Sequence, residues 1–207
     1  TPSHRFILIK NSFRKRNALQ NYDNILYKKS YLPFVTKVAK VYGSEKGDDI
    51  MQYAPYYDAK TSIITSETSQ LKLNSQKGVF EINTPKLQGA VGSLKDVLID
   101  LPFISFKLKN SWASVMIVSK ENKALVDSKT FYLVAVSPVK MTGQKYNDSR
   151  TGLIEPGKLP LQAQQLEGDV IIKVKDKKIK VNPLKADGTK GIGISLVPKE
   201  NGYGLSL

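Results

Sequence analysis

Cysteine is absent from this chain of 207 residues, and histidine occurs once, at His4. Without cysteine the protein can form neither a disulfide scaffold nor a thiolate zinc site, and it has no thiol nucleophile. Because His4 is the one histidine, the chain has almost no means of building a Ser-His-Asp triad or a multi-histidine metal site. These scarcities exclude large classes of enzyme chemistry, and we expect no cofactor and no metal site.

Long apolar runs are missing as well. No run reaches the roughly 18 residues that a membrane-spanning helix needs, so the sequence predicts no membrane span. The apolar stretch Phe6–Ile9 lies between basic residues but is only four residues long and has no small-residue cleavage site, so it is not a convincing signal peptide. Because the chain begins at Thr1 rather than at Met, we expect it to be a processed or truncated part of a longer protein.

Acidic residues are scarce relative to basic ones, 18 against 32, and the net charge is +14. Residues 1–46 hold ten basic and two acidic residues, so +8 of this charge lies near the N-terminus. Such a segment could neutralise nucleic acid, anionic lipid or an acidic polysaccharide. A solubilising segment or an interdomain connection is the simpler interpretation. The candidate basic contacts are Arg14, Lys15, Arg16, Lys28 and Lys29.

The length and the 41% hydrophobic content fit one mid-sized domain with a short appendage, or at most two small domains. We expect residues 1–45 to form a basic connection to a missing upstream domain, and residues 46–207 to form the domain itself. The one helical period lies in Phe13–Lys29, where Leu19, Tyr22, Ile25 and Leu26 recur at three- and four-residue spacing.

From about Val35 onward the sequence indicates short strands separated by turns. Ile104, Phe106 and Leu108 alternate with polar residues, as in a strand with one wet face. We expect the apolar segments Trp112–Val118 and Thr130–Val136 to be central strands buried on both faces. Three further strands are predicted before them, at Val79–Ile82, Leu87–Val91 and Val97–Leu101.

The C-terminal third begins with a polar stretch, Thr142–Gln165. A loop of that length is either functional or a flap over a sheet edge. Val170–Val174 and Ile179–Val181 are predicted to pair as a hairpin, and Gly191–Val197 and Tyr203–Leu207 to close the fold. The predicted class is therefore all-β: an antiparallel two-sheet sandwich, jelly-roll-like, with a partly helical N-terminal extension.

Candidate chemistry is sparse. A glycosidase needs two carboxylates converging on one bond, and the available acids are Asp48, Asp49, Asp58, Glu67, Glu81, Asp96 and Asp100. Most of them lie at predicted turns or strand ends, where satisfying backbone donors or facing water is their ordinary role. Asn147-Asp148-Ser149 and Asp187-Gly188 lack the spacing of a calcium loop and are interpreted as turns. The Gly191–Ile194 segment lacks the features of a phosphate loop.

Aromatic residues offer one further candidate. Tyr53, Tyr56 and Tyr57 cluster beside a proline and could stack against sugars or bases if they lie on an exposed loop. Packing over the open end of the sandwich is the simpler interpretation, and we expect Trp112 to lie in the core.

Two blocks of the sequence have a specific residue order. In the first block, Ile64–Leu71 and Gly78–Gly92 follow a pattern of a Ser-Asp-Thr-Gly opening, a strand, a glycine turn, a strand ending in Asp-Thr-Pro, and Gln before small and apolar residues. The second block includes Ala113–Ser119, Ala124–Lys129 and Thr142-Gly143-Gln144. The order in these two blocks resembles the C-terminal β-sandwich of large bacterial glycoside hydrolases. Departures from the family pattern fall at Glu67, Ser69, Asn83 and Met141.

The resemblance covers about residues 61–170 and implies an accessory domain. In such enzymes a (β/α)8 barrel of the same polypeptide precedes the sandwich and carries the catalytic residues, so no catalytic residue is assigned here. The implied partners are that barrel and a polysaccharide, and the implied location is secreted or at a bacterial cell surface. The Tyr53–Tyr57 segment is the first candidate for the contact and Thr142–Gln165 the second.

Two alternatives stay open. A stand-alone carbohydrate-binding module for anionic glycans would use the tyrosine cluster and the lysines. A basic nucleic-acid or cell-surface binding protein, the less favoured alternative, would use the N-terminal basic residues.

Overall fold

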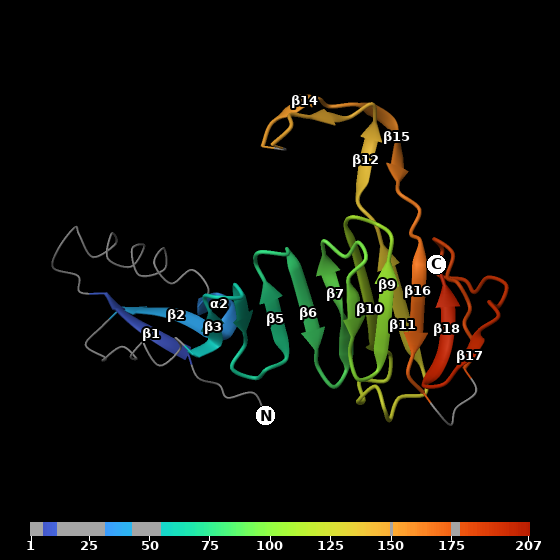
Figure 1. The fold of residues 1–207 in the computed structure, drawn as a ribbon, viewed down its shortest axis with the longest axis horizontal. Coiled ribbons are helices and arrows are strands. Elements are labelled where there is room, and N and C mark those ends of the chain that lie inside the picture. Colours follow the sequence, from blue (N-terminus) through green and yellow to red (C-terminus); the bar gives the residue numbers. More distant parts are fainter. Residues whose placement is uncertain (1–5, 12–31, 43–54, 150, 175–178) are drawn as a thin grey trace. The chain divides into compact units, whose positions relative to one another are not determined.

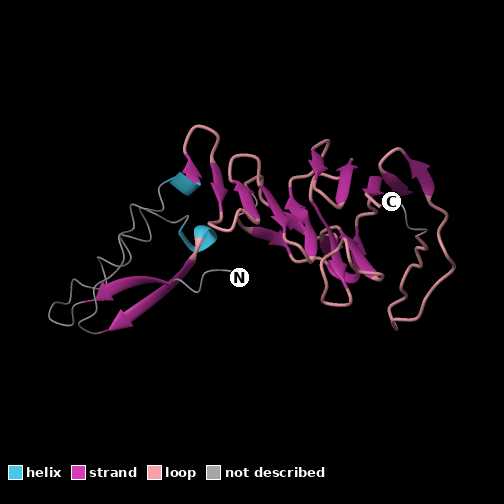
Figure 2. Cartoon of the chain, turned by 90° about the horizontal axis from the view of Figure 1, so that it is seen from below, coloured by secondary structure: helices cyan, strands magenta, loops and turns pink. Residues whose placement is uncertain are grey.

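The computed structural model describes residues 6–11, 32–42, 55–149, 151–174 and 179–207 (Figure 1). The chain divides into two compact units, Thr1–Thr84 and Pro85–Leu207. Strands dominate both units (Figure 2), and all the strand pairs that we describe are antiparallel except one. The predicted all-β class is therefore confirmed. The predicted domain boundary after residue 45 falls within residues that the structure does not describe, so it stays a prediction.

The first unit contains the parallel pair. Strands β1 (Phe6–Asn11) and β2 (Lys37–Tyr42) pair in parallel, from Phe6 opposite Lys37 to Asn11 opposite Tyr42. Parallel strands need a crossover of a dozen or more residues, and the connection between these two ends in the short helix α2 (Leu32–Val35). The helix predicted over Phe13–Lys29 lies outside the described residues.

The remainder of the first unit is an antiparallel meander with its own apolar core. Its strands are β3 (Tyr57–Asp58), β4 (Ile63–Thr65), β5 (Leu71–Asn74) and β6 (Val79–Asn83), paired in that order. Leu32 and Val35 of α2 are buried together with Ile64 and Val79. The α2 helix also holds the meander through its backbone, because Glu67 donates a hydrogen bond of 3.0 Å to the carbonyl oxygen of Val35.

The second unit contains two antiparallel groups of strands and a separate hairpin. One group has the order β11-β10-β7, formed by Phe131–Val136, Ala113–Ser119 and Leu87–Gly92. The other has the order β17-β18-β16-β9-β8, formed by Val197–Lys199, Gly202–Ser206, Gly168–Ile172, Ile104–Leu108 and Leu98–Asp100. The hairpin comprises β12 (Val139–Thr142), β13 (Lys145–Tyr146), β14 (Leu153–Glu155) and β15 (Lys158–Ala163).

The core of the second unit joins these two groups of strands. Val115 and Ile117 of β10 are fully buried, as is Ile104 of β9. The ring of Phe103, just before β9, lies 5.1 Å from the ring of Phe131 in β11. The backbone N–H of Phe103 also donates a hydrogen bond of 2.7 Å to Oε1 of Gln88 in β7. The predicted two-sheet, jelly-roll-like sandwich packing stays a prediction.

Several local expectations are wrong. β11 is an edge strand whose alternate residues are exposed, whereas the sequence predicts that Thr130–Val136 is buried on both faces. Trp112, expected in the core, is 50% exposed. The predicted pairing of Val170–Val174 with Ile179–Val181 does not form, because β16 is paired with β9 on one side and β18 on the other, and Val181 instead bridges to Ile194.

Candidate interaction site

An apolar sheet face is the first candidate surface. Along β10, Ala113, Val115 and Ile117 are buried, so the side chains between them point to the opposite face of the sheet. The register places Met116 opposite Val134 of β11, and Val118 opposite Tyr132 of β11 on one side and Leu87 of β7 on the other. We call this the outer face; its apolar members are Leu87, Val91, Met116, Val118, Tyr132, Val134 and Val136.

Exposure on the outer face is greatest along β11. Tyr132, Val134 and Val136 are 38%, 41% and 51% exposed. The Nζ atom of Lys120 lies 5.6 Å from the centroid of the Tyr132 ring. An antiparallel sheet that faces water usually presents polar residues on that side, and contiguous exposed apolar patches on soluble proteins commonly mark interaction sites. The outer face therefore has the character of a surface that another molecule covers.

The second candidate surface is the hairpin of residues 139–163, which we call the hairpin arm. In Figure 1 it continues beyond the ends of β11 and β16. Val139 pairs with Ala163 and Met141 with Leu161, so these four residues share one side of the hairpin, and Lys140 pairs with Gln162 on the other. Val139, Met141 and Leu161 are 57%, 38% and 60% exposed.

Side-chain hydrogen bonds brace the hairpin arm along its length. The Thr142 hydroxyl donates to the carbonyl oxygen of Pro160 at 2.8 Å. Further out, the Gln144 side chain accepts from the backbone N–H of Met141 at 3.1 Å and donates to the Tyr146 hydroxyl at 3.2 Å. The Nζ atom of Lys145 lies 2.6 Å from a carboxylate oxygen of Glu155 on the opposite strand. These bonds give the arm a defined conformation.

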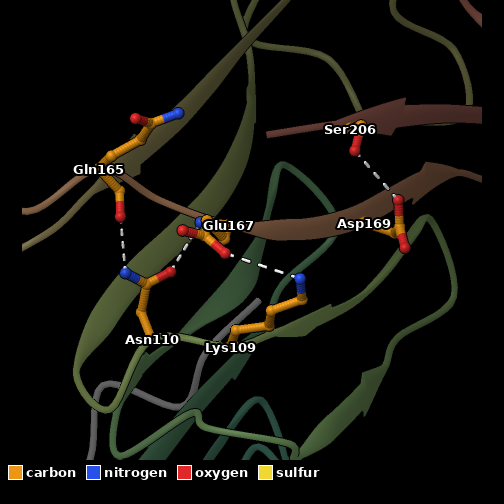
Figure 3. A network of polar contacts seen from close by, with 6 residues as sticks. All are labelled: Lys109, Asn110, Gln165, Glu167, Asp169 and Ser206. Atoms are coloured by element: carbon orange, nitrogen blue, oxygen red, sulfur yellow. Dashed lines mark hydrogen bonds and ion pairs between the residues drawn. The ribbon is translucent and has the colours of Figure 1, made fainter.

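The base of the hairpin arm is held by the buried amide of Asn110 (Figure 3). Its Nδ2 donates to the carbonyl oxygen of Gln165 at 2.8 Å, and its Oδ1 accepts from the backbone N–H of Glu167 at 2.8 Å. The ammonium of Lys109 lies 3.6 Å from the Glu167 carboxylate. On the opposite edge of β16, the Ser206 hydroxyl donates to Asp169 at 3.4 Å (Figure 3). The returning strand of the arm is thus fixed to the turn between β9 and β10.

The sequence prediction of a loop or flap over Thr142–Gln165 needs correction. The segment contains strands β13, β14 and β15, and its first residue ends β12, so it is most of a two-stranded hairpin rather than a structureless loop. The Asn147 side chain closes the turn at its far end by accepting hydrogen bonds from the backbone N–H groups of Thr151 and Gly152 at 2.9 and 3.1 Å. The interpretation of Asn147-Asp148-Ser149 as a turn agrees with this geometry.

The residues singled out from the sequence lie elsewhere. Tyr56 and Tyr57 are half-buried at the start of the meander. Tyr53 lies outside the described residues, as do all five basic candidates: Arg14, Lys15, Arg16, Lys28 and Lys29. The contact role proposed for these residues therefore stays a prediction.

Four of the described carboxylates serve turns or surface ion pairs, as follows. Asp58 accepts hydrogen bonds from the Thr61 hydroxyl at 2.6 Å and the Lys60 backbone N–H at 2.9 Å, and these bonds lower the pKa of its carboxyl. Asp187 is held in the same way by Thr189, whose hydroxyl and backbone N–H lower the Asp187 pKa. Glu81 pairs with Lys72 at 3.2 Å and Asp100 with Lys173 at 2.6 Å. Asp48 and Asp49 lie outside the described residues.

Within the described part of the chain, no group of three or more His, Asp or Glu residues is placed to hold a metal ion. None of the described helices is long and apolar enough to cross a membrane.

Sequence reasoning missed the outer face and the apolar side of the hairpin arm. The continuous apolar run Phe131–Val136 is compatible with a strand buried on both faces and with an edge strand covered by a partner. In the arm, the alternation of Val139 and Met141 with Lys140 was a usable signal for a strand with one apolar side. Comparison with known proteins adds nothing further, since no family model, curated protein or solved structure matches this chain.

Proposed function

We propose that this chain is a non-catalytic β accessory module of a polysaccharide-degrading glycoside hydrolase, and that it packs on the (β/α)8 catalytic barrel of the same polypeptide. The observation that carries the proposal is the outer face of the β11-β10-β7 group. Its exposed Tyr132, Val134 and Val136, with the half-buried Met116 and Val118 beside them, form the kind of aromatic and aliphatic surface that is covered in protein interfaces.

Two further points support this proposal. The resemblance of residues 61–170 to hydrolase sandwiches supplies the identity of the partner. The other point is the parallel pairing of β1 with β2, because all-parallel sheets occur almost only in α/β proteins. A parallel element followed by antiparallel strands is the order expected where a barrel precedes a sandwich.

The proposal is tested by measuring binding of the purified chain to the catalytic barrel, produced separately. Val134→Glu places a charge in the outer face and should weaken binding at least tenfold, since a carboxylate buried without a partner is costly. Leu98→Glu is the matched control: Leu98 is also an exposed aliphatic residue of an edge strand, but in β8 of the other group. We expect it to leave binding within about twofold.

Two outcomes would contradict the proposal. One is the absence of binding between the purified chain and the barrel. The other is hydrolysis of aryl glycosides by the purified chain alone, if that activity is lost when two carboxylates are replaced, because the chain would then carry the catalytic machinery itself.

A second candidate function is carbohydrate binding. The exposed aromatic rings of Trp112 and Tyr146, each 50% exposed, favour it, because planar rings stack on sugars. Affinity electrophoresis on neutral and anionic polysaccharides separates the two functions. Retardation that Trp112→Ala or Tyr146→Ala abolishes would favour the binding module, whereas a purely structural domain migrates unchanged.

A further inference from the structure

The hairpin arm has an exposed apolar side that is separate from the outer face. Its apolar side presents Val139, Met141 and Leu161, all exposed, and no charged residue is paired into that side among β12 and β15. Toward the tip, Tyr146 and Leu153 face each other across β13 and β14 and are each about half exposed. Contiguous exposed apolar residues commonly mark a surface that a partner covers.

The conformation of the hairpin arm is fixed before any partner binds. Gly157 has a φ of +75°, and a Cβ atom there would lie 2.8 Å from both the Gln144 nitrogen and the Thr142 carbonyl oxygen. The two strands therefore cross closely at this point, and Thr142, Gln144 and Asn110 brace the hairpin on either side of it. A braced element loses less conformational entropy on binding than a flexible loop does.

The chemistry of the apolar side selects the class of partner. On β12 and β15 the exposed residues of this side are Val139, Met141 and Leu161, which have no aromatic ring and no charge and therefore suit an apolar protein surface. Bases need aromatic or guanidinium platforms to stack on, and the apolar side of β12 and β15 offers neither. A protein groove is therefore the fitting occupant, rather than a nucleic acid.

The charge of the hairpin arm limits the class of partner further. Lys140 and Lys158 are exposed and have no acidic partner among the described residues, whereas Lys145 is neutralised by Glu155. Residues 139–163 carry four basic and two acidic residues in the sequence. A second copy of the chain would bring another net charge of +14 and be repelled, whereas a carboxylate-bordered surface would be attracted.

From these observations we infer that the hairpin arm inserts its aliphatic side into an apolar groove bordered by carboxylates on the surface of the catalytic barrel. The inference rests on the proposed function, because it names a second contact to the same partner. Lys140 and Lys158 meet the carboxylates at the border of the groove, and Val139, Met141 and Leu161 fill its floor.

The test compares two substitutions that each replace an exposed leucine by glutamate. Leu161→Glu places a carboxylate on the aliphatic side of the hairpin arm, and Leu98→Glu places one on β8, which is not part of the arm. Binding of the full chain to the separately produced barrel is measured by calorimetry at several salt concentrations. We expect Leu161→Glu to weaken binding at least tenfold and Leu98→Glu to leave it within about twofold, with affinity falling as salt rises.

A milder variant, Met141→Gln, guards against local misfolding and should weaken binding in the same direction; circular dichroism confirms that each variant is folded. If the wild-type chain binds but Leu161→Glu and Met141→Gln bind equally well, the inference is overturned and the proposed function stands. If the wild-type chain does not bind the barrel, the proposed function fails and the inference fails with it.

Two other molecules that could cover the apolar side of the arm, a second copy of the chain and a glycan, are tested with the same variants. Self-association in sedimentation equilibrium that strengthens with salt and is lost in Leu161→Glu would identify a second copy as the occupant, because salt screens the repulsion between like-charged chains. Retardation by a polysaccharide that Leu161→Glu removes would identify a glycan. Either result overturns the inference.

Discussion

The buried amide of Asn110 donates a hydrogen bond of 2.8 Å to the carbonyl oxygen of Gln165, which lies 55 residues further along the chain. Through this bond and the one it accepts from Glu167, a single side chain ties the turn between β9 and β10 to the strand that returns from the hairpin arm (Figure 3). Asn110, which is 3% exposed, thus adds two side-chain bonds to the backbone bond of 2.8 Å that the Lys109 N–H donates to the Glu167 carbonyl oxygen.

Replacing Asn110 should therefore be costly. Asn110→Ala removes the partners of the Gln165 carbonyl and the Glu167 N–H, and we expect a loss of about 2–3 kcal/mol in the free energy of unfolding. Urea unfolding monitored by circular dichroism measures it. Asn182→Ala, at an exposed asparagine, is the control and should change stability by less than about 0.5 kcal/mol. Equal effects of the two substitutions would show that the Asn110 bonds contribute nothing.

The two glycines of the hairpin arm with a φ of +75° should differ in their tolerance of alanine. Both Gly143→Ala and Gly157→Ala incur the cost of a left-handed conformation, about 1 kcal/mol. Only at Gly157 would the new Cβ meet backbone atoms, since nothing lies within 4 Å of a Cβ at Gly143. We expect Gly157→Ala to raise the hydrogen-exchange rates of the arm amides several-fold more than Gly143→Ala does. Similar exchange in both variants would mean that the strands do not cross closely there.

The Asp58 turn should make the stability of the folded state depend on pH in the acidic range. Because the Thr61 hydroxyl, and after it the Lys60 N–H, lower the pKa of Asp58 below its ordinary 3.8, the ionised carboxylate stabilises the folded state above that value. This contribution is lost as the pH falls through the lowered pKa. Thr61→Ala should raise the Asp58 pKa toward 3.8 in an NMR titration, and Thr61→Ser, which keeps the hydroxyl, should not. An unchanged pKa in Thr61→Ala would exclude this hydroxyl as the main cause.

Gln88 should matter for the packing of the two strand groups of the second unit. Its buried Oε1 accepts the hydrogen bond from the Phe103 N–H, so Gln88→Met leaves that donor without its partner at nearly constant side-chain volume. We expect a loss of about 1–3 kcal/mol in the free energy of unfolding, measured by thermal and urea denaturation. Gln164→Met, at an exposed position, is the control. A neutral Gln88→Met would mean that water replaces the lost acceptor.

Local patterns in the sequence predicted local structure well. The alternation of Ile104, Phe106 and Leu108 indicated a strand with one buried face, and β9 buries these three residues, although Ser105, predicted on the wet face, is buried as well. The turns at Asn147 and Asp187 were also recognised, because Asn and Asp accept hydrogen bonds from the backbone a few residues ahead of them. In each case the deciding interactions lie within a few residues of one another.

The candidate site was harder to predict, because it depends on what covers each strand. Phe131–Val136 has the same composition whether one face or both faces are covered, and Trp112 has no neighbour in sequence that reveals its exposure. The parallel pair β1 and β2 was not foreseen either, since its partners are separated by a connection of 25 residues. A local period in the sequence does not show which distant strands pair with each other.

The sequence by itself determined that this protein is built from short strands, that its charge is strongly basic, and that it lacks thiol chemistry, because these properties follow from composition and from periods of two residues. Only the tertiary structure decided that β11 lies at an edge, that Thr142–Gln165 belongs to a braced hairpin, and that the apolar sides of both stay exposed. The physical reason is that a strand's pattern states which side chains alternate, whereas the pairing of distant strands settles which of its faces another surface can cover.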